Sequence, residues 1–287
     1  MRAVRFHEHG GPDVLTVDEV DDPDPDYGQV LVDIEDEIAR ITLNRPDARN
    51  ALSAPAANEL VAAIDTAEDS SARCVVLQSN GGAFCAGGDV HAMIESIEQD
   101  VSPAERVELV VGAVNRSIRR VYECRLPTVA KIDGPAFGAG AGLAIACDLQ
   151  LASPAAKISF GFRRVGLSID SGVSHILPRL VGLNTAKELV FTGELIDADR
   201  ARDLGLFTRV FEADSFDDGV ENMAETIAAG PTVALSASKR LLNHQSNSFD
   251  AATSREANAQ GIAFGTADHE EGAQAFVEGR EPAFEGR

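Results

Sequence analysis

Short apolar segments recur along the chain, and they limit most strongly what it can fold into. Residues 74–78, 128–132 and 149–152 carry almost no charge, and stretches with helical periodicity, such as 58–68 and 103–121, lie between them. Strands that are apolar throughout are covered on both faces of their sheet. Buried strands that alternate with helices indicate an α/β fold. Other predicted strands are 30–34, 37–43, 158–160 and 206–211, and 140–147 is a predicted apolar helix.

The first thirty residues differ from the rest of the chain. Residues 2–7 and 14–20 flank the turn signal His-Gly-Gly-Pro at 9–12, which predicts a short hairpin. The acidic, proline-containing segment 18–26 predicts a solvated linker. The chain after residue 166 is predicted to be mainly helical. The predicted divisions are an N-terminal extension (1–29), a core (30–210) and a C-terminal helical region (211–287).

The charge of the chain excludes several classes of partner. It carries 46 acidic and 25 basic side chains, a formal net charge of −21 at pH 7. A nucleic-acid partner is not expected, because binding phosphates requires a basic surface. The longest uncharged apolar stretch, 136–147, is too short for the roughly 20 residues of a membrane span. No apolar stretch follows the charged residues at the N-terminus, so we expect no signal peptide and a cytoplasmic location.

The basic side chains are almost all arginines, because the chain has only four lysines. An acidic, lysine-poor surface stays hydrated at high salt, where screening cancels its self-repulsion. We therefore hypothesise a halophilic source. The alternative is an ordinary acidic enzyme of the cytoplasm.

Metal and redox chemistry find little support in the sequence. The four cysteines show no C-x-x-C spacing and are predicted to be buried, reduced thiols. The six histidines are scattered without other metal-ligating residues nearby, so no metal site is expected. Gly138 and Gly140 begin a possible dinucleotide fingerprint, but Leu143 stands where the third glycine is required. No redox cofactor is expected.

Three glycine-containing loops are the candidate functional segments: 83–90, 133–142 and 162–172. Small residues in the first two let backbone N–H groups approach a ligand closely. The second loop runs into the N-terminus of the apolar helix, where free N–H groups and the helix dipole favour negative charge. The third contains Asp170 just before a predicted helix, so Asp170 is either a functional acid or a helix cap.

Together with their flanking segments, these loops resemble the crotonase superfamily, the enoyl-CoA hydratase/isomerase family. The resemblance covers about residues 30–287 in the family's order. It implies an α/β crotonase (ClpP/crotonase-like) spiral of ββα units, with a C-terminal helical region that forms a homotrimer or homohexamer. The segments that carry it are I-T-L-N-R-P (41–46), N-A-L (50–52), F-C-A-G-G-D (84–89), P-T-V-A (127–130), A-C-D (146–148), L-P-R-L-V-G (177–182), T-G-E (192–194), E-G-A-Q-A-F (271–276) and R-E-P-A-F (280–284).

The resemblance also implies a catalytic arrangement. In the family, two backbone N–H groups hold the thioester oxygen of an acyl-CoA and stabilise the enolate formed when a neighbouring carbon exchanges a proton. The matching positions are Gly88 and Ala139. Loss of one such donor typically costs ~10²–10³ in rate.

Coenzyme A enters only as part of the substrate, and no separate cofactor is implied. Ala86 matches the position whose backbone meets the adenine of CoA. Arg49 and Lys239 are candidate partners for its anionic groups, although either could be an ordinary surface charge. Asp89 is also expected to cap the helix that follows it. The residues expected to bind CoA are Ala86, Gly87, Gly88, Asp89 and Arg49.

Two departures from the family pattern favour isomerisation over hydration. Hydratases of the family use two glutamates, and the resemblance places them at Gly142 and Phe162, neither of which can exchange a proton. The segment 166–172 resembles instead the isomerase branch, which includes 1,2-epoxyphenylacetyl-CoA and dienoyl-CoA isomerases, with its catalytic aspartate at Asp170. An apolar pocket would raise the pKa of this carboxyl and suit it to carry a proton.

Three functions remain open. The first is isomerisation of an unsaturated or epoxide-bearing acyl-CoA with Asp170 as acid and base. The second is hydration of a 2-enoyl-CoA, and the third is binding of an acyl-CoA without catalysis. Residues 1–29 also resemble the opening hairpin of quinone oxidoreductases, which suggests an NADPH-dependent reductase. Because no nucleotide fingerprint follows, that segment is interpreted as an appendage.

Overall fold

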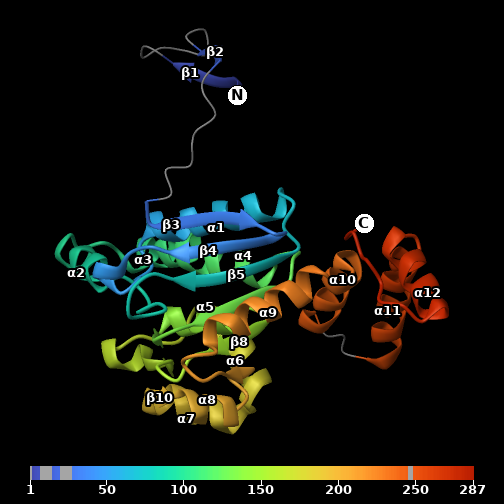
Figure 1. The fold of residues 1–287 in the computed structure, drawn as a ribbon. Coiled ribbons are helices and arrows are strands. Elements are labelled where there is room, and N and C mark those ends of the chain that lie inside the picture. Colours follow the sequence, from blue (N-terminus) through green and yellow to red (C-terminus); the bar gives the residue numbers. More distant parts are fainter. Residues whose placement is uncertain (1, 7–14, 20–27, 245–247) are drawn as a thin grey trace.

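The computed structural model describes residues 2–6, 15–19, 28–244 and 248–287 (Figure 1). A six-stranded sheet with the order β11-β8-β6-β5-β4-β3 forms its centre. All neighbouring strands are parallel except β3 and β4, which form an antiparallel pair. The predicted α/β class is therefore confirmed. The strands are β3 (Val30–Glu35), β4 (Ile38–Leu43), β5 (Cys74–Ser79), β6 (Thr128–Ile132), β8 (Leu149–Ala152) and β11 (Arg209–Val210).

Helices cover both faces of this sheet, as its apolar strands require. Side chains alternate along a strand, so Val75 and Leu77 of β5 join the core beneath α1 (Ala54–Glu68). Cys74 points to the opposite face and joins the core beneath α9 (Phe216–Ala228). The first four residues of β5, 74–77, are all apolar because neither face of this part of the strand meets water.

A second, smaller sheet has the order β10-β9-β7. Its strands are β7 (Pro135–Phe137), β9 (Lys157–Ser159) and β10 (Ile196–Asp197). Helix α5 (Ala139–Ala146) follows β7 directly and is buried at all its residues, which explains why its sequence has no polar face.

The hairpin strands predicted near the N-terminus are β1 (Arg2–Phe6) and β2 (Leu15–Glu19), and they pair antiparallel. The predicted turn at 9–12 lies outside the described residues, as does most of the predicted linker.

Two predicted elements differ in the structure, and the short strands β7 and β10 were not predicted. The single helix predicted at 103–121 is wrong, because a π-helix interrupts it. The strand predicted at 206–211 is reduced to β11. None of the helices in the described ranges is long and apolar enough to cross a membrane. The remaining helices are η2 (Pro46–Ala48), α2 (Val90–Glu98), α3 (Pro103–Leu109), η3 (Val110–Asn115, the π-helix), α4 (Arg116–Tyr122), η4 (Gly161–Val165), α6 (Val173–Val181), α7 (Leu183–Thr192), α8 (Ala198–Asp203), α10 (Thr232–Asn243), α11 (Phe249–Ala263) and α12 (Ala267–Glu278).

Candidate active site

The first two glycine loops meet beside the N-terminus of α5. The N–H of Phe137 donates to the carbonyl of Cys85 at 2.9 Å, which joins the two loops side by side. Gly87 has a positive φ of +95°, and a Cβ placed on it would lie 2.6 Å from the carbonyl oxygen of Phe137 and 3.3 Å from the nitrogen of Ala139. Only glycine fits this approach. It brings the backbone before Gly88 against the first residue of α5.

The amides of Gly88 and Ala139 are not used in the hydrogen bonds of the described chain. Within the residues that the structure describes, neither of these N–H groups donates to an acceptor of the chain. Ala139 is the first residue of α5, and the preceding Gly138 provides no side-chain cap. Unbonded N–H groups at a helix N-terminus attract negative charge.

A left-handed turn at Arg49 and Asn50 supports the first loop. The N–H of Ala86 donates to the carbonyl of Arg49 at 2.9 Å, and the N–H of Leu52 donates to the carbonyl of Gly87 at 2.7 Å. The structure thus brings together three of the residues expected to bind CoA: Ala86 and Gly87 of the first loop, and Arg49, the candidate partner for the anionic groups of CoA.

Asn50, to which the sequence assigned no role, holds this turn to the first loop. The side-chain amide of Asn50 is buried and donates to the carbonyls of Asn80 and Ala83 at 2.9 and 2.8 Å. Its Oδ1 accepts from the N–H of Arg45. Its place in the N-A-L segment was the only signal in the sequence.

Asp89 caps α2, as expected. Its Oδ1 accepts the N–H groups of His91 and Ala92, and its Oδ2 pairs with Arg45 at 3.1 Å. Burial alone would raise the pKa of Asp89, but Arg45 and the two helix amides outweigh it and lower the pKa. The carboxylate is therefore already engaged, and a contact to CoA would have to come from the backbone of Asp89.

Asp170 lies half-buried between η4 and α6. The Ser171 hydroxyl donates to its Oδ1 at 2.6 Å. Burial raises the pKa of the Asp170 carboxyl, and the hydrogen bond from Ser171 offsets part of that effect. The alternative role as a helix cap is wrong, because the N-cap of α6 is Gly172 and no side chain caps that helix.

Ser171 packs against Gly142, in the first turn of α5. A Cβ placed on Gly142 would lie 2.7 Å from the Cβ of Ser171 and 3.0 Å from its carbonyl oxygen. The loop that carries Asp170 is thus docked on the helix that begins with Ala139. Any side chain at position 142 would require that loop to move.

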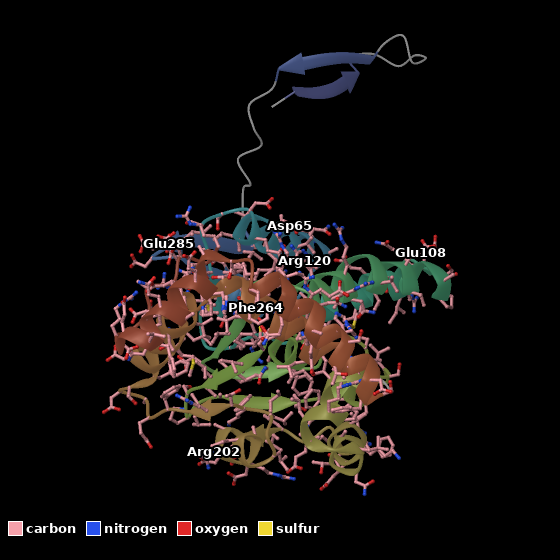
Figure 2. The ribbon with its side chains drawn as sticks, turned by 90° about the vertical axis from the view of Figure 1, so that its right-hand side faces the viewer. Asp65, Glu108, Arg120, Arg202, Phe264 and Glu285 are labelled. Carbon is pink, nitrogen blue, oxygen red and sulfur yellow. The ribbon has the colours of Figure 1, made fainter. Side chains whose placement is uncertain are left out.

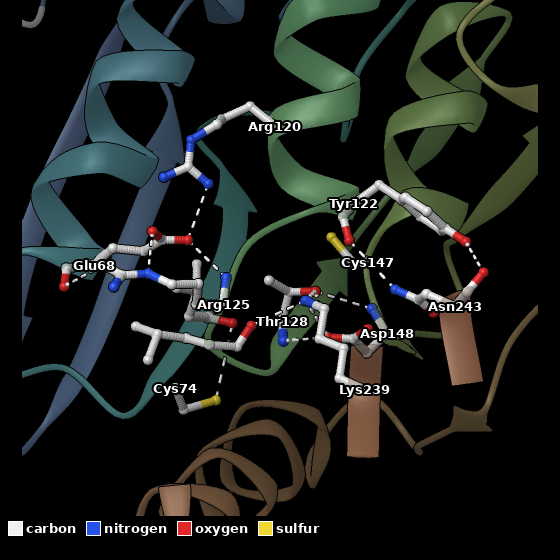
Figure 3. Close-up of polar contacts among 12 residues, drawn as sticks. Glu68, Cys74, Arg120, Tyr122, Arg125, Thr128, Cys147, Asp148, Lys239 and Asn243 are labelled. Atoms are coloured by element: carbon white, nitrogen blue, oxygen red, sulfur yellow. Dashed lines mark hydrogen bonds and ion pairs between the residues drawn. The ribbon is translucent and has the colours of Figure 1, made fainter. Parts of the chain in front are cut away.

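Lys239 has a different role from the two that the sequence suggested. It is 9% exposed, and its Nζ lies 2.7 Å from Asp148 Oδ2 and donates to the carbonyl of Leu126 at 2.9 Å. Figure 3 shows this contact beside Thr128, whose N–H and hydroxyl donate to the same carboxylate. A CoA contact and a surface charge are therefore both wrong for Lys239, which anchors α10 to the core.

All four cysteines are free and buried, as predicted. Burial raises the pKa of Cys74, Cys85 and Cys124 to about 12, so these thiols stay protonated at neutral pH. Among the described residues no group of three or more potential ligands is placed to hold a metal ion.

Comparisons with known proteins agree on one family. The family model described as enoyl-CoA hydratase/isomerase matches residues 33–287. The chain is 34% identical to the crotonyl-CoA hydratase of Syntrophomonas wolfei, over 90% of this chain and 98% of that protein. It is 30% identical to the 1,2-epoxyphenylacetyl-CoA isomerase of Escherichia coli, with coverages of 90% and 98%. The crystal structure of an enoyl-CoA hydratase from Polaromonas sp. JS666 matches with a TM-score of 0.83 and 30% identity, over 89% of this chain and 99% of that one.

Proposed function

Because the chain belongs to the enoyl-CoA hydratase/isomerase family and has the crotonase fold that its sequence predicted, we propose that it is an acyl-CoA isomerase. One observation carries this choice. A half-buried carboxyl with a raised pKa, Asp170, lies on a loop packed against the first turn of α5, where Gly142 provides no second carboxylate.

The oxyanion site is proposed to consist of the amides of Gly88 and Ala139. Their N–H groups donate to the thioester oxygen, and the dipole of α5 adds to the stabilisation of the enolate. Fixed amides at a buried helix terminus require no reorganisation when the charge develops. The two glycine loops that meet here supply both donors.

Asp170 is proposed to carry the proton. With a 3-enoyl-CoA, its carboxylate removes a proton from C2, and the electrons of that C–H bond form a conjugated dienolate. The protonated Asp170 then returns the proton at C4, so the double bond moves from C3–C4 to C2–C3 and no atom is gained or lost. A carboxyl whose pKa is raised toward neutrality exchanges protons more readily in both directions.

CoA is proposed to lie along the turn at Arg49 and the backbone of Ala86 and Gly87. Arg49 is exposed, so its guanidinium can pair with phosphate. No further cofactor is required, because the thioester itself stabilises the enolate.

Hydration is the second candidate, and the relatives named as hydratases favour it. Against it, position 142 is a glycine and supplies no carboxylate to activate water, and a glutamate there would collide with Ser171. Binding without catalysis is a third candidate.

Turnover of three substrates separates these functions: crotonyl-CoA, 3-hexenoyl-CoA and an epoxide-bearing aromatic acyl-CoA. We expect isomerisation of 3-hexenoyl-CoA or of the epoxide to exceed hydration of crotonyl-CoA. We expect Asp170→Asn to lower isomerase kcat by roughly 10²–10⁴-fold. The matched control is Asp197→Asn, which alters the N-cap of α8 and should leave kcat unchanged. Wild-type turnover in Asp170→Asn would contradict the assignment, and faster hydration than isomerisation would favour a hydratase.

A trimer is proposed for the assembly, as the resemblance implies. Helix α11 has no buried residue, and large apolar side chains of the C-terminal helices are exposed, Phe264 by 64% and Phe276 by 87%. Figure 2 looks onto this face, with Phe264 near its centre. Apolar surface of this kind marks contacts between proteins. Light scattering should give three or six times 30.3 kDa, and a monomeric mass would contradict the proposal.

A further inference from the structure

Asn115 is the last residue of the π-helix η3, and its side chain is turned toward the candidate catalytic loop. π-Helical turns are rare and frequently occur at functional sites. Asparagine is a favoured helix cap, yet the side chain of Asn115 makes no capping bond to the α4 helix that follows it. Instead its Oδ1 accepts the N–H of Ser171 at 2.9 Å, from 56 residues away in sequence.

Ser171 has an unusual backbone that must be held in place. Its φ is +57°, in the left-handed region that non-glycine residues rarely adopt, and the residue is 1% exposed. Such conformations persist when the surrounding structure determines them from several sides. Asn115 accepts the N–H of Ser171, and Gly142 packs against its Cβ and its carbonyl oxygen.

The hydroxyl of Ser171 links this arrangement to the carboxyl. It donates to Asp170 Oδ1 at 2.6 Å, a short hydrogen bond that fixes the rotation of the carboxyl group. We propose that Asn115 is a positioning residue, which holds the Ser171 turn so that its hydroxyl aims Asp170 at the substrate. This inference rests on the proposed role of Asp170 as proton carrier.

Few other groups act on Asp170. Within the described residues, its pKa depends on burial, the Ser171 hydroxyl and its own backbone, and no charged side chain contributes. Helices α5 and η3 contain no titratable residue. On η4, Arg163 and Arg164 donate to the carbonyls of Thr192 and Gly193. On α6, His175 lies edge-on to Tyr122, and Arg179 donates to the carbonyl of His175. Among the described residues, the Ser171 hydroxyl is therefore the one side chain that changes the pKa of Asp170 through a hydrogen bond.

Two variants of Ser171 separate its hydroxyl from its backbone. Both variants remove the hydroxyl. Ser171→Gly also relieves the strain of the positive φ, because glycine adopts that conformation readily, whereas Ser171→Ala retains the strain. With 3-hexenoyl-CoA we expect both to lower kcat by about tenfold, with KM changed less than about twofold, as for the loss of one hydrogen bond made to a charged group. We also expect the acidic limb of the kcat–pH profile to move to higher pH, because the bond that lowers the pKa of Asp170 is gone.

A double-mutant cycle tests whether Asn115 acts through that hydroxyl. We expect Asn115→Ala to lower kcat in the same way. Because the two residues act in series, Asn115→Ala combined with Ser171→Ala should be no worse than the poorer single variant. The matched control is Ser117→Ala: its hydroxyl bonds the carbonyl of Val114 at the same helix junction and does not touch Asp170. Its kcat and pH profile should equal those of the wild type.

The outcomes distinguish this inference from the proposed function. Wild-type kcat and pH profile in Ser171→Gly, or multiplicative losses in the double variant, would overturn the role of Asn115. If Asn115→Ala does not fold, wild-type kcat and pH profile in both Ser171 variants would still overturn the proposal, because Asn115 is proposed to act through that hydroxyl. An inactive Asp170→Asn combined with wild-type behaviour of both Asn115 and Ser171 variants would remove only the positioning role. Full turnover in Asp170→Asn would remove the proposed function itself.

Discussion

The fold holds Asp170 in an environment that disfavours its charged form. Burial raises the pKa of this carboxyl above its ordinary value of 3.8, so the unfolded chain releases the proton at lower pH than the folded protein does. The folded state therefore loses stability as the pH rises from 3.8 through the raised pKa, and the loss persists at neutral pH. A group needed for proton transfer commonly reduces stability in this way.

We accordingly expect Asp170→Asn to be more stable than the wild type at neutral pH. Asparagine keeps an oxygen that can accept from the Ser171 hydroxyl but carries no charge into the buried site. The urea midpoint should be higher for the variant at pH 7.5, and the difference should disappear as the pH falls below 3.8. An equal or lower midpoint at pH 7.5 would show that the buried carboxylate does not destabilise the folded state.

Individual residues were predictable where the local backbone dictates their type. The glycine at 87 follows from loop chemistry, because its place allows no side chain, whereas Ala139 at the helix N-terminus was indicated by the family resemblance. Asn115 was not predictable, because its partner lies 56 residues away and its own segment has ordinary helical periodicity. Lys239 was misassigned for a similar reason: only the tertiary fold brings Asp148 within 2.7 Å of it.

At the level of elements, one half-buried carboxylate joins three segments of the chain. Glu68, at the end of α1, accepts from Arg120 of α4 and from the backbone and side chain of Arg125, just before β6 (Figure 3). Burial alone would raise the pKa of Glu68, but these hydrogen bonds outweigh it and lower the pKa to about 2. The carboxylate therefore stabilises the fold above its ordinary pKa of 4.5, and this contribution is lost as the pH falls toward 2.

We expect Glu68→Gln to lower the free energy of unfolding by about 2 kcal/mol at pH 7. The difference from the wild type should shrink as the pH falls below 4.5. Glu123→Gln is the control, because Glu123 forms an exposed pair with Arg119 on α4 and should cost less than about 0.5 kcal/mol. Urea unfolding at pH 7 and pH 3 measures both. Equal losses in the two variants at pH 7 would contradict a special role for Glu68.

Elements were predictable from the sequence when their own residues carry the signal. The apolar run at the start of β5 and the fully apolar α5 can be predicted from their own residues. Strand β7 does not: it has three residues and exists because it pairs with β9. The π-helix η3 also escaped prediction, because apolar residues recur through it at ordinary helical spacing.

For the whole molecule, the net charge of −21 is the property that most affects behaviour in solution. Charged side chains such as Asp65, Glu108 and Glu285 lie around its periphery (Figure 2). At low ionic strength their repulsion destabilises the compact state, and salt screens it over about 10 Å at 0.1 M.

We expect the unfolding temperature to rise steadily from low to molar KCl, in keeping with the halophilic hypothesis. Sucrose at matched concentrations is the control, because it strengthens apolar burial without screening charge. A larger effect of KCl than of sucrose would support screening. No gain with KCl would remove the hypothesis.

The contact between Gly142 and Ser171 also bears on how such a protein could change its chemistry. A glutamate at 142 would have to push the Ser171 turn away, and Asp170 would move with it. Under the proposed roles, a lineage that exchanged proton transfer for water addition would pass through an ancestor competent in neither. No single substitution would then convert one activity into the other.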